Sequence, residues 1–369
     1  MNKKFLLVIV LVFVYLSLTG CWDQRLLKNG RLVFASSFDL IDGKTIQSTA
    51  IIRDFKNGTP TNVIIQGKGN TIRETRMIMD RKISGNFEPS KNRVFLLGEE
   101  LAKKDIYQFL DIFYRDPNSS ISAKIAVVDG KGEEILNKIS EKNILIAEFL
   151  IELIASSEAS TASPKHNVQS ICTVMFDEGK DFAIPLIKLN DENEVELEGT
   201  GIFHNKSLVD TLNVQESTLF LIMANQKAKI ARLATKVESD KKLNINNFIT
   251  YNISKAKSKL KIVSDSPSNI QIEIDVKADI SVVEYPEDQL TDKKKLKELN
   301  NEISKKLTEE AENLIKKIQL ANSDLFGIGR ELIAYHPKTW EKVNWEELYP
   351  RITITPSIEV DIVGHGIIN

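Results

Sequence analysis

The sequence predicts a multi-domain α+β protein, of two or three domains, in which mixed or antiparallel sheets are flanked by helices. Three observations lead to this fold class. Segments with strand and helix patterns alternate between residues 94 and 156, as in an α/β unit. Every second residue from 270 to 282 is apolar, as in a strand with one buried and one solvated face. Apolar residues then recur at helical spacing from 296 to 318.

The N-terminal half is expected to begin with short strands and helices. Strands are predicted at residues 32–35, 48–54, 94–97 and 121–128, and helices at 71–79, 99–114 and 133–156, the last being one helix or two. Gly67 and Gly69 predict a tight turn before the first helix. They suggest a phosphate-binding loop only superficially, because the G-x-x-x-x-G-K-[ST] spacing is absent.

The pattern changes near residue 190. Residues 156–170 are small and polar, the most loop-like stretch of the chain, and strand character resumes over residues 172–188. An acidic turn follows at residues 191–194. We place a domain boundary at this turn. It separates an N-terminal α/β region of one or two subdomains, residues 21–193, from a C-terminal α+β domain, residues 194–369.

The C-terminal domain is expected to open with a hairpin over residues 199–209 and a helix over residues 215–226. It is expected to end in a strand over residues 352–362. Pro356 interrupts this strand, and proline lacks a backbone N–H. The strand is therefore predicted at a sheet edge or a bulge.

The alternating strand at residues 270–282 is longer than most strands, so we expect it to bend or to project beyond its sheet. Thr291 or Asp292 can cap the helix that follows. The apolar stripe of that helix is narrow, and its opposite face is dense in lysine and glutamate. This pattern fits either a solvated helix packed on its own sheet or a coiled coil with a partner.

The first twenty residues predict a secretory signal peptide. Lys3 and Lys4 form a short positive segment, and residues 5–18 are almost entirely apolar. As a helix this run would span about 21 Å, which is shorter than a hydrocarbon core of about 30 Å. It ends in Leu18-Thr19-Gly20-Cys21, which resembles the lipobox of bacterial lipoproteins. In such proteins the cysteine thiol receives a diacylglyceryl group and becomes the new N-terminus.

We therefore predict that residues 1–20 are removed and that Cys21 is lipidated. The alternatives are an ordinary signal peptide or an uncleaved anchor, with an incidental cysteine in either case. The chain contains two cysteines, and a lipidated Cys21 would leave Cys172 without a disulfide partner. Stability would then come from packing alone.

Size and composition are those of a globular protein. Hydrophobic residues make up 42% of the chain and charged residues 27%. The net charge is −2, and it becomes −4 without Lys3 and Lys4, because 47 basic residues then face 51 acidic ones. Such a balance offers no long-range attraction for nucleic acid or anionic lipid.

The search for catalytic or metal-binding motifs gives no support for an enzyme. No histidine has a second histidine within four residues, as short-spaced metal ligands would require. The four are His166, His204, His336 and His365. The G-x-S-x-G motif of α/β hydrolases is absent. Asp324-Leu-Phe-Gly327 lacks the other kinase motifs. We expect this segment to be structural, with Phe326 anchoring a turn and the glycines allowing close packing. No cofactor or metal is expected.

Several short motifs, taken in order, resemble the Ger(x)C family, the lipoprotein C subunits of bacterial spore germinant receptors. The motifs are Cys21-Trp22-Asp23, Gly69-Asn70-Thr71 before Arg73-Glu74, Val94 to Ala102, Gly130 before Ile135-Leu136, Gly199 to Phe203, and Asp324 to Gly329 followed by Pro337 and Trp340. The resemblance spans nearly the whole mature chain. Thr75 and Gly132 stand where the family usually has alanine, and we interpret both as packing variations.

The resemblance implies a non-enzymatic, three-domain α+β lipoprotein on the outer face of the spore inner membrane. It would assemble with two integral membrane subunits, A and B, in a complex that responds to small germinants such as amino acids. In that family, ligand recognition is attributed mainly to the B subunit. The resemblance therefore implies that this chain does not bind the germinant directly. The alternative function is that of a solute-binding lipoprotein, which captures a small molecule itself.

Overall fold

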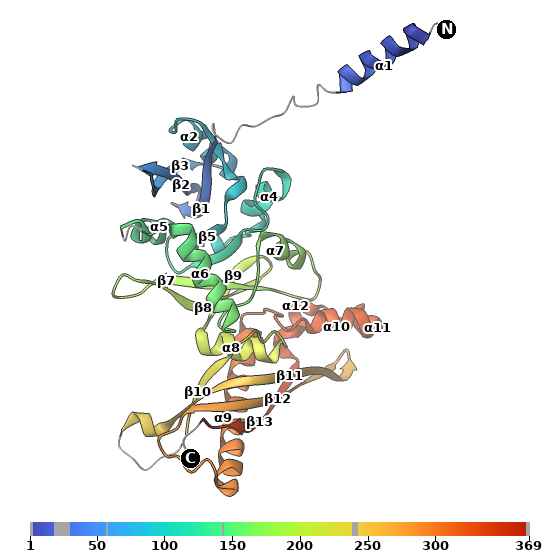
Figure 1. Cartoon of the computed structure of the whole chain (residues 1–369). Coiled ribbons are helices and arrows are strands. Elements are labelled where there is room, and N and C mark those ends of the chain that lie inside the picture. Colours follow the sequence, from blue (N-terminus) through green and yellow to red (C-terminus); the bar gives the residue numbers. More distant parts are fainter. Residues whose placement is uncertain (1–2, 18–29, 57, 142–143, 238–242, 367–369) are drawn as a thin grey trace.

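Two β-sheets, one after the other along the chain, organise the protein (Figure 1). The structure is a computed structural model, and it describes residues 3–17, 30–56, 58–141, 144–237 and 243–366. We refer to residues 30–213, which carry the first sheet, as the N-terminal body. Residues 214–366, which carry the second sheet, are the C-terminal body. This arrangement confirms the α+β class with mixed sheets.

The first sheet has the strand order β3-β2-β1-β5-β6-β7-β8-β9, and β4 pairs with β1 off this path. Its strands are β1 (Gly30–Ile41), β2 (Thr45–Lys56), β3 (Thr59–Gly69), β4 (Asn86–Glu88), β5 (Val94–Gly98), β6 (Lys124–Val128), β7 (Ala183–Leu189), β8 (Val195–His204) and β9 (Ser207–Asn213). Strands β1, β5, β6 and β7 are parallel neighbours, and antiparallel pairs extend the sheet on both sides. Because helices cover both faces, the central strand β5 is fully buried.

The helices around the first sheet are short. They are α2 (Ile72–Asp80), α3 (Glu99–Ala102), α4 (Tyr107–Arg115), α5 (Gly132–Glu141), α6 (Ile146–Ala159) and α7 (Val168–Met175). Apart from the body, α1 (Lys3–Ser17) forms a separate helix. Within the described residues, no helix combines the length and apolarity that a membrane crossing requires.

The second sheet has the order β10-β11-β12-β13. Its elements are α8 (Val214–Met223), β10 (Arg232–Lys236), β11 (Phe248–Ser266), β12 (Asn269–Glu284), α9 (Lys293–Leu320), α10 (Ile328–Tyr335), α11 (Pro337–Trp340), α12 (Trp345–Leu348) and β13 (Thr353–Gly364). Strand β12 is antiparallel to β11 and parallel to β13. The sheet is therefore mixed.

The alternation of β12 and the stripe of α9 are confirmed, because the two elements share one core. The apolar residues of β12 from Ile270 to Val282 are all buried, and the residues between them are not. Leu299 and Ile318 lie at the two ends of the buried stripe of α9. Asp292 caps this helix by accepting a hydrogen bond from the Lys294 amide at 2.8 Å. The helix therefore packs on its own sheet.

Strand β13 is the edge of the second sheet, as Pro356 predicted. Side chains of α9 close this edge. The backbone amides of Ile358, Val360 and Ile362 donate to Thr308 Oγ1, Ser304 Oγ and Asn300 Oδ1, at 3.2, 2.9 and 3.0 Å. Four residues of helix rise about 6.0 Å and two residues of strand about 6.6 Å. Every fourth residue of α9 therefore stays opposite every second residue of β13 along this row of hydrogen bonds.

Three predicted segments differ from the structure, because tertiary contacts outweigh local pattern. Gly67 and Gly69 lie within strand β3 instead of a turn, and a Cβ on Gly67 would collide with the Thr75 carbonyl of α2. The helix predicted at 99–114 is two helices. The Ile106 amide, between them, donates to the Lys206 carbonyl at 2.9 Å.

The stretch at 156–170 is less loop-like than predicted. Helix α6 continues to Ala159, and Ser157 and Ser163 are buried with their hydroxyls 2.7 Å apart. Asn167 then starts α7 with a capping box, so Cys172 lies in a helix and strand structure resumes only at Ala183.

The two positions that depart from the family pattern are both tightly packed. A Cβ on Gly132 would lie 2.5 Å from Ser37 Cβ. The Thr75 hydroxyl lies 2.6 Å from the Ser48 hydroxyl, and both side chains are buried. Each residue therefore matches a local contact that alanine would change.

The two bodies join without a linker. The turn at residues 191–194 connects the paired strands β7 and β8, so the first sheet continues to Asn213. Helix α8 begins at the next residue. Asn213 caps it, because its Oδ1 accepts from the Glu216 amide and its own amide donates to Glu216 Oε2, both at 2.9 Å. Ile202 and Leu212 of the first sheet also belong to the core of the second.

Candidate functional site

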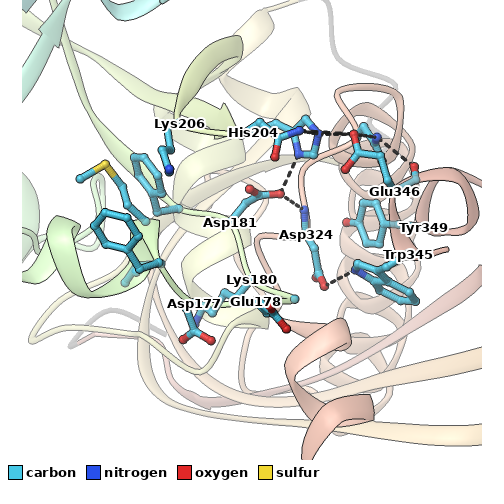
Figure 2. A pocket seen from close by; sticks show the side chains of 17 residues that line it. Asp177, Glu178, Lys180, Asp181, His204, Lys206, Asp324, Trp345, Glu346 and Tyr349 are labelled. Carbon is cyan, nitrogen blue, oxygen red and sulfur yellow. Dashed lines mark hydrogen bonds and ion pairs between the residues drawn. The ribbon is translucent and has the colours of Figure 1, made fainter. Parts of the chain in front are cut away.

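A cavity of about 280 Å³ lies where the two bodies meet. Its walls come from residues 174–182 and 204–206 of the N-terminal body and from residues 322, 324, 345, 346 and 349 of the C-terminal body. Figure 2 shows the charged side chains that converge on it, with Asp181, His204, Asp324 and Glu346 linked by hydrogen bonds. The site is thus built from segments far apart in the sequence.

The predicted hairpin at residues 199–209 is confirmed, and its turn positions His204. Strands β8 and β9 are joined by Asn205 and Lys206, which have positive φ angles of 47° and 67°. Two such residues form the type I′ turn that suits the twist of a hairpin. His204 therefore ends β8 opposite Ser207, with its ring beside the C-terminal body.

His204 bridges carboxylates of both bodies. Its Nδ1 lies 3.0 Å from Asp181 Oδ2, and its Nε2 lies 2.7 Å from Glu346 Oε1. Burial disfavours the charged ring, but the hydrogen bonds to Asp181 and Glu346 outweigh burial and raise the pKa of His204 to about 9. The ring is consequently an imidazolium at neutral pH and ties α12 to the β8–β9 turn.

Asp324 organises the loop before α10. Its Oδ1 accepts from the Ile328 amide at 2.9 Å, and its Oδ2 accepts from the Gly329 amide at 2.7 Å and from Trp345 Nε1 at 3.2 Å. Complete burial raises the pKa of Asp324 to about 7, against the lowering effect of these donors. Its backbone is paired with Asp181, whose Oδ2 accepts from the Asp324 amide at 2.8 Å.

The glycines that follow Asp324 allow close packing, as expected from the sequence. Gly327 has a φ angle of +72°, which favours glycine. The Arg330 amide donates to the Gly179 carbonyl at 2.9 Å, so the α10 start lies directly on the N-terminal body. The Phe326 ring packs against Phe220 of α8 with centroids 5.6 Å apart. The segment is structural, as predicted.

The other histidines occupy separate positions. His166 is close to α7, with Nδ1 3.1 Å from Ser170 Oγ, and burial lowers its pKa to about 4. His336 lies 2.9 Å from Asp265 Oδ2, and His365 follows β13. Among the described residues, no group of histidine, cysteine, aspartate or glutamate is arranged to hold a metal ion.

The predicted lipidation site, Cys21, lies outside the described residues. No sequence pattern singles out Asp181 or Glu346. Glu346 is 142 positions from His204, and no local pattern links the two. The closest signal was the motif at Asp324, which marked one wall of the cavity.

Comparisons with known proteins agree with the fold. The family model of the spore germination protein N-terminal domain matches residues 23–189, and that of the spore germination B3/GerAC-like C-terminal domain matches residues 198–366. The crystal structure of the GerBC protein superposes with a TM-score of 0.55 at 19% identity, covering 89% of this chain and 96% of that one. This likeness shows a shared fold.

Relatives match over the full length. Spore germination protein GerQC of Bacillus cereus is 25% identical, covering 100% of this chain and 99% of the relative. Spore germination protein B3 of Bacillus subtilis is 23% identical, with 97% of each chain covered. The fold and these matches define a spore germination protein. The chain belongs to the GerAC-like family of such proteins, as the sequence motifs indicated.

Proposed function

We propose that this protein is a non-enzymatic, membrane-anchored lipoprotein subunit of a spore germinant receptor. It would serve nutrient-triggered germination by assembling with integral membrane A and B subunits on the outer face of the spore inner membrane. The observation that carries the proposal is the match to spore germination proteins along the whole chain, through both family domains. We keep the division between residues 193 and 194 as the proposed boundary of the two family domains, because it falls between the two matched ranges. Strands β8 and β9 would then belong to the C-terminal domain while completing the first sheet.

The N-terminus supports membrane anchoring. The apolar run at residues 5–18 ends at the lipobox-like Leu18-Thr19-Gly20-Cys21. Each buried CH₂ of an acyl chain contributes about 0.8 kcal/mol, and two chains hold a protein stably where one does not. An anchored protein would meet its membrane partners at a high effective concentration, which favours assembly.

The polar groups at the junction support a structural role over a catalytic one. Both ring nitrogens of His204 are engaged by carboxylates. A ring held as an imidazolium between Asp181 and Glu346 cannot accept a proton from a substrate. The Asp324 carboxylate is likewise occupied by three donors. This arrangement joins two bodies, as a scaffold subunit requires.

The experiment compares Cys21→Ala with Cys172→Ala, since these are the two cysteines of the chain. In spores, Cys21→Ala should leave the membrane fraction and slow germination, whereas Cys172→Ala should behave as the parent. Intact-mass measurement of the parent should show residues 1–20 missing and a diacylglyceryl adduct on Cys21. Full membrane retention and normal germination of Cys21→Ala would contradict the proposed anchor.

Assembly is tested separately. The protein should co-purify with the A and B subunits from detergent-solubilised spore membranes. Recovery of those subunits as a complete receptor without this chain would contradict its role as a subunit.

A further inference from the structure

One side of the second sheet is open along most of β11. This strand has 19 residues, whereas its neighbour β10 has five and pairs only with residues 248–252. Figure 1 shows the β11–β12 hairpin extending past β10. No described strand pairs with residues 254–264 on this side, and we call these residues the open edge. The other edge of the sheet, β13, is closed by side chains of α9.

Backbone groups of the open edge point away from β12. The Ser258 amide donates to Asn225 Oδ1 at 3.3 Å, so it is directed to the open side. The register with β12 is regular from Lys255 to Ile262, and alternate residues of a strand direct their backbone groups to the same side. The N–H and C=O groups of Leu260 and Ile262 therefore face the open side, where no described backbone group meets them. Such groups form a template for another strand.

The side chains on the core face of the open edge are apolar. Leu260 and Ile262 pack against the core of the second sheet but are only partly buried. Val263, which lies beside them at a bulge, is 55% exposed. A strand that paired with this edge would bring its own side chains next to Leu260 and Ile262, so apolar residues fit there.

The outer face of the open edge carries lysine at every second position: Lys255, Lys257, Lys259 and Lys261. Acidic residues of β12 neutralise two of them, because Lys255 lies 4.0 Å from Asp279 and Lys261 pairs with Asp275. Lys257 lies opposite Lys277, and Lys259 lies opposite the Asp275 that Lys261 already engages. Neither Lys257 nor Lys259 has an ion-pair partner among the described residues. Anionic neighbours on the open side would therefore stabilise this row.

The lysines also indicate which kind of strand fits. Two copies of the open edge would bring lysines together, so pairing with a second copy of the chain is unfavourable. A strand that carries carboxylates on its outer face would instead meet Lys257 and Lys259 with the opposite charge.

We propose that the open edge binds an extended segment of a partner protein in which acidic and apolar residues alternate. The segment adds a strand to the second sheet. Its backbone pairs with Leu260 and Ile262, its apolar side chains cover these two residues, and its carboxylates lie beside Lys257 and Lys259. This inference goes beyond the proposed receptor function, because it assigns an interaction surface, and it does not depend on the lipid anchor.

The experiment titrates the full chain, kept soluble in detergent, against a labelled peptide of alternating valine and glutamate at pH 7.5. Both peptide ends are blocked, and repulsion between the glutamates keeps the peptide monomeric. Fluorescence anisotropy should give a dissociation constant on the order of 100 μM at low ionic strength, and binding should weaken as salt is added. A peptide of alternating valine and lysine should bind at least tenfold more weakly.

Alternate N-methylation tests the geometry of the added strand. One valine–glutamate peptide is methylated on every valine nitrogen, and a second on every glutamate nitrogen. A strand at a sheet edge turns only every second amide toward the sheet, so only one of these two peptides should keep its affinity.

Charge exchange assigns the binding to the open edge. The double variant Lys257→Glu with Lys259→Glu should bind the valine–glutamate peptide at least tenfold more weakly and should bind the valine–lysine peptide more tightly than the parent does. The control, Lys297→Glu with Lys316→Glu, makes the same change of net charge at exposed positions of α9 and should bind as the parent.

Three outcomes would overturn the proposal: no saturable binding of the valine–glutamate peptide, equal affinity of the two N-methylated peptides, or a similar loss of binding in both double variants. The last would mean that the peptide responds only to overall charge. Because none of these variants touches Cys21, a failure here would leave the fractionation test of the proposed function unaffected.

Discussion

Gly179 and Gly329 contact each other backbone to backbone, and this contact brings the two bodies together. A Cβ built on Gly329 would lie 2.7 Å from Gly179 Cα and 2.8 Å from Trp345 Nε1. A Cβ built on Gly179 would lie 2.5 Å from the Gly329 carbonyl carbon. Real Cβ atoms do not approach backbone so closely, so only glycine fits at both positions.

Gly329→Ala should therefore destabilise the protein by about 3 kcal/mol, because the added methyl group forces the bodies apart and displaces Trp345 from Asp324. Gly43→Ala is the control. Gly43 has a φ angle of +67° and nothing within 4 Å of its built Cβ, so it should lose only about 1 kcal/mol through backbone strain. Denaturant unfolding measures both, and equal losses would contradict the packing argument.

The His204 bridge should make stability depend on pH. The pKa of His204 is about 9 in the folded protein and about 6.5 in the unfolded chain. The folded state thus holds its proton more tightly. The contribution is complete below pH 6.5 and is lost as pH rises through 9. Because Glu346, one of the two partners, is 54% exposed, solvent screening reduces this contribution to about 1–2 kcal/mol.

His204→Gln should remove this dependence. Unfolding free energies of the parent and the variant should differ most at pH 6.5 and converge by pH 9.5. Asp324, whose pKa is about 7, also titrates within this range, but both proteins retain it, so its effect cancels in the difference between them. Parallel pH profiles would show that the His204 bridge contributes no net energy.

The ladder between α9 and β13 predicts a difference between two neighbouring asparagines. Asn300 accepts from the Ile362 amide at 3.0 Å and donates to Asp361 Oδ1 at 2.9 Å, whereas Asn301 is exposed. Asn300→Ala should cost about 1–2 kcal/mol. Asn301→Ala gains the same helix propensity without losing these hydrogen bonds. The difference between the unfolding free energies of the two variants therefore measures what the Asn300 hydrogen bonds contribute. Urea unfolding provides the measurement.

Arg76 and Arg73 provide a second matched pair. Arg76 is 7% exposed, lies 3.2 Å from Asp116 and stacks 4.9 Å from the Phe113 ring centroid. Arg73 also approaches Asp116, at 3.6 Å, but is largely exposed. Arg76→Ala should cost about 2–3 kcal/mol, because it removes packing and leaves Asp116 without its buried partner. Arg73→Ala should cost about 0.5 kcal/mol or less. Similar losses would refute this distinction.

Elements with long, regular patterns were predictable from the sequence. Strand β12 and helix α9 repeat their apolar residues over many turns or pairs, and burial follows the repeat. Segments held by polar contacts were not. The buried serines at 157 and 163 satisfy each other, and Lys124 pairs with Glu158 at 2.6 Å. Small polar residues are typical of loops, so the sequence alone could not reveal that these are enclosed.

The site was only partly predictable for a related reason. The motif at Asp324 could be recognised as a structural turn because its glycines are adjacent in sequence. The His204 bridge depends on Asp181 and Glu346, which come from different elements. Charge pairing of this kind appears only once the chain is folded, and histidine spacing carries no signal for it.

The corner at Asn213 determines how a mechanical load would pass through the molecule. Strand leads into helix across a single peptide bond, and the cap at Glu216 is itself held by Lys317 of α9 at 3.0 Å. No flexible residues separate the two elements at this position. A force applied to the second sheet would therefore be transmitted directly to the first, so the two bodies would rotate together as one rigid unit.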